Sequence, residues 1–270
     1  MKELIFIDGK PFDRNFPLRS LFYGEGLFET FRWRTVPPVF WNKHIERMRK
    51  GAGVLEIPFP EPKYIKETVE KAVLDSNISD AYVKICLLSQ GDSVFYESAS
   101  GSLLLVIVKE YQPLNEPLKA HFSYFTRNSS SPLIRLKSLN YLENILAKRE
   151  VRKSGFDEAI FLNERGDITE GATSNIFWLK KGTLITPSLE CGLLPGVIRE
   201  VIIDIAREIG IEVSEERFNL NDLISSQTAF FTNSLLGAVS ISQVNEFKSF
   251  LNTQEFLSIQ TALLNKLGWI

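Results

Sequence analysis

The alternation of apolar and polar residues predicts strands and helices in two blocks. In the first block, runs rich in Val, Ile, Leu and aromatic residues predict strands. These runs lie at 4–7 (before the Asp8-Gly9 turn), 28–33, 39–41, 81–89 and 103–111. Apolar residues at helical spacing predict two helices in the same block, over 43–50 and 64–75.

The second block follows the stretch 112–117, whose Pro and Asn content predicts a linker. Helices are expected at 140–153, 196–209 and 253–267, and strands at 157–162, 174–179, 183–186, 229–232 and 238–244. The expected domains are therefore 1–111 and 118–270, joined by the linker 112–117.

Composition narrows the class of protein. The chain has 270 residues, 44% hydrophobic, and a formal net charge of −2 without runs of like charge. This argues against binding nucleic acid or a membrane surface through basic patches. The N-terminus lacks the pattern of a signal peptide, and the apolar run at 103–108 is too short to cross a bilayer. With two cysteines and no disulfide pattern, we expect a cytoplasmic protein.

Several chemistries are disfavoured by the residue types present. The two histidines, His44 and His121, and the two cysteines show no metal-ligand spacing, so no metal site is expected. A Gly-x-Ser-x-Gly nucleophile motif is also absent from the sequence. The chemistry must then rest on Lys, Arg, Glu or a cofactor.

Lys137 is a candidate for covalent chemistry because it lies just before a predicted helix. A lysine that forms a Schiff base with pyridoxal phosphate needs an acid at the pyridine nitrogen and a phosphate site. Glu170, after the turn at 165–167, is the candidate acid. The alternatives remain open: most lysines are solvated surface residues, and Glu170 by itself suits an exposed hairpin.

Three segments are candidates for binding phosphate. The helix start at Gly196, with Val197 and Ile198, offers free N–H groups. Arg47 offers a planar guanidinium, unless it forms a surface ion pair with a neighbour such as Glu46. Ser234 lies in a polar turn after a predicted strand.

Taken together, six motifs resemble those of the class IV aminotransferase family, the fold-type IV pyridoxal-phosphate enzymes. They occur in the family's order and span most of the chain. The motifs are Phe22-Tyr23-Gly24-Glu25-Gly26-Leu27-Phe28-Glu29-Thr30, His44-Ile45-Glu46-Arg47, Lys137-Ser138-Leu139-Asn140-Tyr141-Leu142, Thr169-Glu170-Gly171-Ala172-Thr173-Ser174-Asn175-Ile176-Phe177, Leu194-Pro195-Gly196-Val197-Ile198-Arg199 and Thr232-Asn233-Ser234.

The resemblance implies an α/β (α+β) fold with a small α/β N-terminal domain and a larger C-terminal domain built on a barrel-like sheet. It also implies pyridoxal 5'-phosphate as cofactor, an amino-carboxylate as substrate and a homodimer. By position, Lys137 matches the Schiff-base lysine, Glu170 the residue at the pyridine nitrogen and Tyr141 a residue near the ring hydroxyl. The other cofactor contacts that it implies are Arg47, Ser174, Asn175, Val197, Ile198 and Ser234.

Within the family, the motif wording is most similar to that of the aminodeoxychorismate lyases. The alternative is a transaminase of branched-chain or related amino acids. A lesser alternative is a non-catalytic binding protein on the same scaffold. D-amino-acid aminotransferases are disfavoured, because the loop 90–97 lacks the Arg and His that they use for the substrate carboxylate.

The substrate carboxylate needs a cation, and two residues are candidates. Lys84 resembles in position an arginine of the branched-chain aminotransferases, and strand alternation places it on one face with Tyr82. Arg32 is the second candidate. It remains open that Lys84 is a solvated strand residue.

Overall fold

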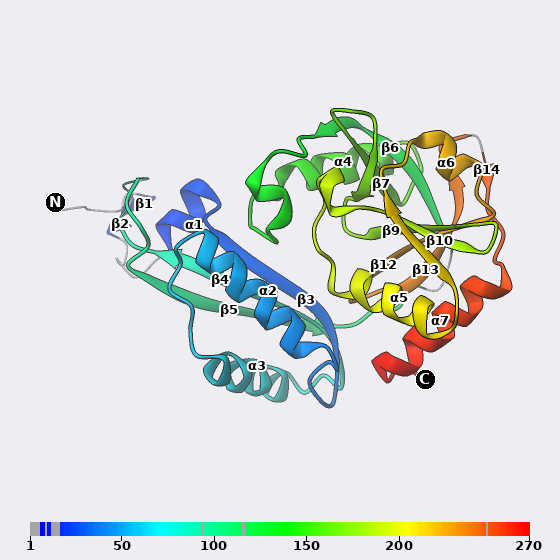
Figure 1. Ribbon diagram of the computed structural model, residues 1–270. Helices are drawn as coiled ribbons and strands as arrows, with labels where there is room; N and C mark the ends of the chain where they lie inside the picture. The colour runs from blue at the N-terminus through cyan, green and yellow to red at the C-terminus, as the bar shows by residue number, and fades with distance from the viewer. Residues whose placement is uncertain are drawn as a thin grey trace. The chain divides into compact units, whose positions relative to one another are not determined.

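The computed structural model describes residues 6–8, 10–11, 17–92, 94, 96–114, 117–246 and 248–270. The chain forms two compact units, seen in Figure 1. The smaller unit comprises Met1–Pro37, Trp41–Tyr111 and Lys137–Asn140, and the larger unit comprises Pro38–Phe40, Gln112–Leu136 and Tyr141–Ile270. The segment that carries Lys137 thus packs with the smaller unit. The predicted domain limits stay a prediction, and Asn115 and Glu116 of the predicted linker lie outside the described residues.

The smaller unit is built on an antiparallel sheet in the order β3-β4-β5. Its strands are β3 (Gly26–Arg34), β4 (Asp80–Gln90) and β5 (Gly101–Glu110), which confirms the three longest strands expected in this block. A separate hairpin pairs β1 (Phe6–Ile7) with β2 (Lys10–Pro11), and its turn residue Gly9 lies outside the described residues.

Three helices accompany this sheet: α1 (Leu18–Tyr23), α2 (Trp41–Val54) and α3 (Pro62–Ser76). The strand expected at 39–41 is wrong, because a turn covers the first two residues and Trp41 begins α2. The physical reason is the helical spacing of Trp41, Ile45 and Met48, which are all buried. The helix expected at 43–50 was therefore too short.

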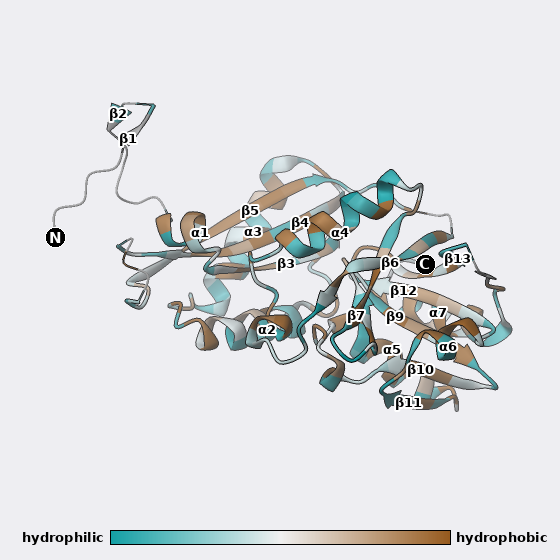
Figure 2. Cartoon of the chain, turned by 90° about the horizontal axis from the view of Figure 1, so that it is seen from above, coloured by the Kyte–Doolittle hydropathy of each residue, from teal (hydrophilic) through white to brown (hydrophobic). Residues whose placement is uncertain are grey.

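The two faces of the smaller sheet differ, because successive strand residues point to opposite sides. Phe31 and Trp33 of β3 are buried against α2, where their rings contact Trp41. On the exposed side, β5 shows three apolar side chains at alternate positions: Leu103, Leu105 and Ile107. Figure 2 shows β5 as brown along much of its length.

The larger unit contains one mixed sheet, which has nine strands among the described residues. In spatial order they are β11 (Glu212–Glu216), β10 (Thr183–Pro187), β9 (Asn175–Lys180), β12 (Thr228–Asn233), β13 (Gly237–Val244), β6 (Leu118–Arg127), β7 (Glu158–Asn163) and β8 (Ile168–Gly171), with β14 (Lys248–Ser249) beside β13. The parallel pairs are β10–β11, β13–β6 and β6–β7.

This sheet curls until its two ends approach each other. Ile168 in β8, at one end, donates its N–H to the carbonyl oxygen of Phe218 at 2.8 Å, and Phe218 follows β11 at the other end. Curling of this kind removes exposed sheet edges. The expected α/β (α+β) fold with a barrel-like sheet is confirmed.

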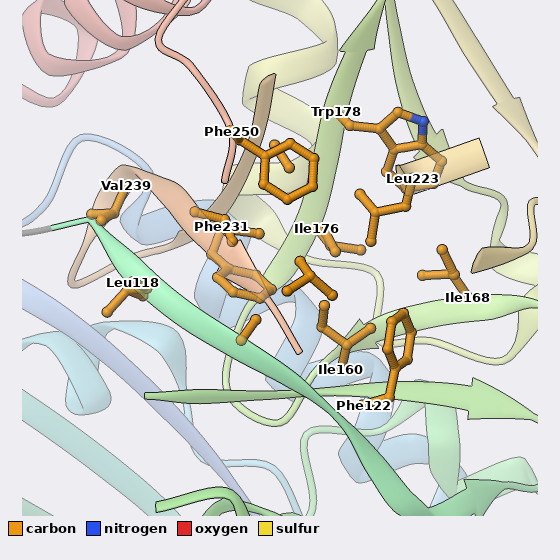
Figure 3. Packing of buried hydrophobic residues seen from close by; sticks show 14 of the residues in the cluster. Leu118, Phe122, Ile160, Ile168, Ile176, Trp178, Leu223, Phe231, Val239 and Phe250 are labelled. Carbon is orange, nitrogen blue, oxygen red and sulfur yellow. The ribbon is translucent and has the colours of Figure 1, made fainter. Parts of the chain in front are cut away.

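The core inside the curled sheet comes from alternate strand residues. Ile176 and Trp178 of β9 and Phe231 of β12 point into it, and Figure 3 shows them packed together with Ile160 and Phe122. The residues between them face the opposite way and pack under two helices. This outer layer includes Phe177, Leu179 and Phe230 from the strands, with Ile198, Ile202 and Ile205 from α5 and Phe256, Ile259 and Leu263 from α7.

The helices of the larger unit are α4 (Leu142–Lys153), α5 (Val197–Glu208), α6 (Leu220–Ile224) and α7 (Gln254–Leu267), with 3₁₀ turns at Pro132–Arg135 and Leu189–Cys191. Three of these helices were expected. The apolar pattern did not predict seven helices and strands, which are short or irregular: α1, α6, β2, β6, β8, β11 and β14. In the part of the chain that is described, no helix has both the length and the apolar character to span a bilayer.

We expect Phe231→Ala to lower the free energy of unfolding by about 3–5 kcal/mol, because Phe231 is fully buried inside the curled sheet. Urea unfolding followed by tryptophan fluorescence measures this change. Leu251→Ala is the matched control, since Leu251 is 76% exposed and its loss should change the stability by less than about 0.5 kcal/mol. Equal effects of the two substitutions would contradict the assignment of this core.

Candidate active site

Lys137 lies on a short segment that is hydrogen-bonded to β3. The N–H of Phe28 donates to the carbonyl oxygen of Lys137 at 2.8 Å, and the N–H of Leu139 donates to that of Gly26 at 2.9 Å. A side chain at Gly26 would not fit, since its Cβ would lie 2.7 Å from Leu139 Cδ1 and 2.9 Å from the Leu87 carbonyl oxygen. Gly26 therefore allows this segment to lie close to the strand.

The side chain of Lys137 lies over an aromatic ring of β3. Its Nζ is 4.6 Å from the ring centroid of Phe28, and the Nζ of Lys84 is 4.2 Å from the same centroid. The negative face of an aromatic ring attracts ammonium groups. Lys84 is half-buried, and the described residues show no ion pair between it and an acid. Its role at a substrate carboxylate stays a prediction.

Arg32, the other candidate for the substrate carboxylate, is held by an acid. Its Nε donates to Asp80 Oδ1 at 2.7 Å and its Nη2 to Asp80 Oδ2 at 2.5 Å. The guanidinium also lies 4.2 Å from the ring centroid of Tyr111. The hydrogen bonds from Arg32 lower the pKa of Asp80. Arg32 is thus paired with an acid, whereas Lys84 lies over the Phe28 ring.

The loop 90–97 is hydrogen-bonded to a side chain of α1. The buried Arg19 of α1 donates through Nη1 to the carbonyl oxygen of Val94 at 2.8 Å. Ser93 and Phe95 of this loop lie outside the described residues. The pattern along the chain gave no signal for this role of Arg19.

Arg47 belongs to a buried network on the helix side of β3. Its Nε donates to Glu29 Oε1 at 2.7 Å and its Nη2 to Glu29 Oε2 at 2.6 Å. Nδ1 of His44 lies 2.7 Å from the same Oε2. The alternative that Arg47 pairs with Glu46 on the surface is wrong, since Glu46 pairs with Arg49.

The pKa values of Glu29 and His44 are both lowered in this network. Burial alone would raise the pKa of Glu29, but the charges and hydrogen bonds of Arg47 and His44 outweigh it and lower this pKa to about 2. Burial lowers the pKa of His44, and the charges of Arg47 and Lys137 act in the same direction against the attraction of Glu29. At neutral pH, Glu29 is therefore charged and His44 is neutral.

In the larger unit, Glu170 at the end of β8 is buried, with 9% exposure. The alternative of an exposed hairpin glutamate is therefore wrong. Its Oε1 lies 3.5 Å from Nη2 of Arg127, and its Oε2 accepts the N–H of Leu194 at 3.2 Å. Arg127 is itself buried over the ring of Phe161 and also pairs with Glu143 at 2.8 Å.

The turn after Glu170 is held by side chains from two elements. The hydroxyl of Tyr141 donates to the Ala172 carbonyl oxygen at 2.9 Å, and Nδ2 of Asn144 donates to the same oxygen at 2.7 Å. From β7, the buried carboxylate of Glu158 accepts the hydroxyl of Thr173 at 2.6 Å. These bonds fix the backbone that carries the candidate residues 170–175.

The expected contacts Ser174, Asn175 and Ser234 lie near neighbouring strand ends, because β9 and β12 pair in register there. Nδ2 of Asn175 donates to both the carbonyl and the hydroxyl oxygen of Thr232 at 2.9 Å. Asn233 donates to the Thr173 carbonyl oxygen at 3.1 Å. This bond ties the turn that contains Ser234 to the turn after β8.

The start of α5 packs against the same strand end. Gly196 is the N-cap, and no side chain caps the helix. A Cβ at Gly196 would lie 2.0 Å from Oδ1 of Asn175, so glycine is required for this approach. The first-turn N–H groups, including those of Val197 and Ile198, have no acceptor within the helix. They form a site of positive potential that suits an anion.

Residues around these sites that were given no role from sequence include Glu29, His44, Arg127 and Glu158. Glu29 and His44 stand inside the motifs, so the motifs were the signal. Arg127 and Glu158 carried no signal, because their importance comes from burial beside residues far along the chain. The described residues contain no cluster of three or more His, Cys, Asp or Glu that could hold a metal ion.

Comparison with known proteins decides the family. The profile of the family described as amino-transferase class IV matches residues 26–244. The chain belongs to the class IV aminotransferase family. The matched range contains all eleven candidate residues named from the sequence.

Relatives of more than one activity occur among the similar proteins. The aminodeoxychorismate lyase of Bacillus subtilis is 35% identical over 243 residues, which cover 87% of this chain and 81% of that protein. The branched-chain-amino-acid aminotransferase of Pseudomonas aeruginosa is 29% identical over 247 residues, covering 84% and 78%. A Legionella pneumophila structure, assigned as a 4-amino-4-deoxychorismate lyase, has a TM-score of 0.88 at 28% identity and covers 92% of this chain and 93% of its own.

The donors in each unit fit the pyridoxal phosphate of this family of enzymes. In the larger unit, the uncapped start of α5 suits a phosphate, and the buried carboxylate of Glu170 suits a protonated ring nitrogen. In the smaller unit, Lys137 offers an amine, and Arg47 a guanidinium. The family assignment and the chemistry of the residues therefore agree.

The Glu29 network predicts a loss of stability in acid. Because the folded pKa of Glu29 is lowered from 4.5 to about 2, its contribution is full above pH 4.5 and is lost as the pH falls towards 2. The full loss is about 3 kcal/mol. His44, whose pKa is lowered from 6.5, adds a loss that begins below that pH.

The predicted loss of stability in acid is tested by urea unfolding of the native chain and of Glu29→Gln between pH 8 and pH 3. The variant should be less stable at neutral pH, and the difference between the two proteins should shrink below pH 4.5. A difference that stays constant with pH would contradict the shift.

Proposed function

We propose that this chain is a pyridoxal-phosphate enzyme that acts on an amino-carboxylate, with the reaction of the aminodeoxychorismate lyases. The second candidate is transamination of branched-chain or related amino acids, which the 29% identical aminotransferase supports. The observation that carries the proposal is the placement of Lys137, whose backbone pairs with β3 and whose ammonium shares the Phe28 ring with Lys84. A protein that only bound a ligand would not need an amine held in this way.

Pyridoxal phosphate, when bound, supplies an electron sink for the substrate's alpha carbon. Lys137 would hold the cofactor through its amine and would move the proton at the substrate's alpha carbon. The carboxylate of Glu170 would hold a proton at the ring nitrogen, and the hydroxyl of Tyr141 would lie near the ring hydroxyl. Arg47 and Ser234 would bind the phosphate.

The remaining residues of the larger unit would shape the phosphate site. The N–H groups of Val197 and Ile198 would donate to the phosphate, next to Ser174 and Asn175. Asn175 supports this role because its amide is already held by Thr232 and touches the helix start. For the whole protein we propose a homodimer in the cytoplasm.

The choice between lyase and transaminase is made by assay. Purified protein loaded with cofactor is incubated with aminodeoxychorismate, or with leucine and a 2-oxo acid acceptor, and the products are separated by chromatography. The proposal expects release of an aromatic amine and pyruvate from the first substrate. Turnover of leucine alone would favour the second candidate.

Lys137→Ala should abolish turnover and the visible absorbance that depends on the covalent link, because the variant lacks the amine that the proposal assigns to the cofactor. Lys71→Ala is the control, since Lys71 is an exposed helix residue paired with Asp75. Absorbance spectra and turnover of the three proteins are compared. Substantial turnover in Lys137→Ala would refute the assignment, and a colourless native protein would favour the non-catalytic alternative.

Lys84 is proposed to bind the substrate carboxylate, with Arg32 as the weaker candidate. Lys84→Met should raise KM about tenfold or more while the cofactor absorbance stays unchanged, because a charge-assisted hydrogen bond is worth about 1.5–3 kcal/mol. Arg32→Met should act mainly on stability, through the loss of the Asp80 pair. If Arg32→Met raises KM and Lys84→Met does not, the two roles are reversed.

A further inference from the structure

Glu29 is a buried carboxylate whose place in the mechanism above is unassigned. It is fully buried in the middle of β3, next to the Phe28 ring that underlies Lys137. Both of its oxygens are engaged by Arg47, and one also contacts His44. Removing a carboxylate from water costs several kcal/mol. We therefore expect the buried Glu29 to have a function besides stabilising the fold.

The pair fixes the plane of the Arg47 guanidinium. Two parallel hydrogen bonds, of 2.7 and 2.6 Å, join the Nε and Nη2 edge to the carboxylate. An arginine side chain carries about 2 kcal/mol of rotamer entropy, which a ligand must otherwise overcome. Because Glu29 holds Arg47 in place beforehand, an anion bound at its outer edge meets a preorganised donor.

His44 holds the carboxylate in turn. The imidazole is 1% exposed, and its ring centroid is 5.3 Å from that of Phe31. Since burial lowers the pKa of His44, the neutral ring donates its Nδ1 proton to Glu29 without adding charge. His44 therefore helps to orient the Glu29 carboxylate, and Glu29 in turn orients the Arg47 guanidinium.

We propose that Glu29 is a positioning residue that sets Arg47 for the phosphate group of the ligand, and so makes the site prefer a phosphorylated ligand over its dephosphorylated form. This rests on the proposed phosphate role of Arg47. The change in the ratio of the two affinities between the native chain and a variant isolates the phosphate contact, because differences between the free ligands are the same for both proteins.

If only the charge of Glu29 mattered, Glu29→Gln would have the opposite effect on phosphate binding to the one that the positioning role predicts. The negative charge of Glu29 weakens the positive potential of Arg47, so Glu29→Gln would strengthen phosphate binding if charge were all that mattered. Orientation predicts weaker binding, since the NH2 group of the amide cannot accept a hydrogen bond, so the two parallel bonds from Nε and Nη2 cannot both form. The sign of the change therefore decides between the two.

The test uses cofactor-free protein, titrated with pyridoxal phosphate and with pyridoxal while absorbance is recorded. We expect Glu29→Gln to lower the preference for the phosphorylated ligand roughly tenfold, the size of one charge-assisted hydrogen bond. Asp80→Asn makes the same carboxylate-to-amide change in the Arg32 pair of the same sheet and should leave the preference unchanged. Thermal unfolding of each variant shows that it is folded.

Arg47→Ala and the double variant separate this inference from the proposed function. The preference should fall in Arg47→Ala, and adding Glu29→Gln should then change nothing, because Glu29 acts through Arg47. An unchanged preference in Arg47→Ala would overturn the phosphate role itself. A fall in Arg47→Ala with an unchanged or raised preference in Glu29→Gln would overturn the positioning role of Glu29 alone.

Should Glu29→Gln fail to fold, Glu29→Asp replaces it. Asp keeps the charge but is shorter by one methylene, so it moves the carboxylate away from Arg47. The positioning role expects a lower preference for phosphate in this variant too. A preference equal to that of the native chain would overturn it.

Discussion

The smaller unit depends on one geometric constraint, the opposite orientation of successive side chains in β3. Phe28 points to the face where the Lys137 ammonium lies, and Glu29 points to the face covered by α2, where it binds Arg47 and His44. Two adjacent residues thereby contact different cations: Phe28 contacts Lys137, and Glu29 binds Arg47. A register shift by one residue would bury the wrong side chain on each face.

The larger unit depends on a different constraint, the curling of its sheet. The pairing of β9 with β12 brings Asn175 beside Thr232, and α5 begins against Asn175 because Gly196 has no side chain. Segments more than fifty residues apart along the chain thus meet at one strand end. The inner core, with Ile176 and Trp178, holds the strands in this arrangement.

Buried carboxylates recur in both units, and each has a cationic partner. Glu29 has Arg47, Glu158 has Lys148 at 2.9 Å, and Glu170 has Arg127. Such pairs add little net stability, because desolvation opposes their attraction, but losing one partner is strongly destabilising. Their common effect is to fix the orientation of side chains and turns, which an enzyme of this family requires for catalysis.

The sequence by itself determined the main elements, the fold class and the family. Apolar periodicity located long elements such as α5, and the motifs selected Lys137, Glu170 and Arg47. It missed short elements such as β8, because four residues carry too little periodicity to distinguish strand from turn. Tertiary structure alone decided that Arg32 is held by Asp80 while Lys84 has no described acid partner, and that Arg127 lies beside Glu170. These are contacts between distant segments, and the spacing of residues along a chain does not specify which side chains meet once the sheet has curled and the strands have paired.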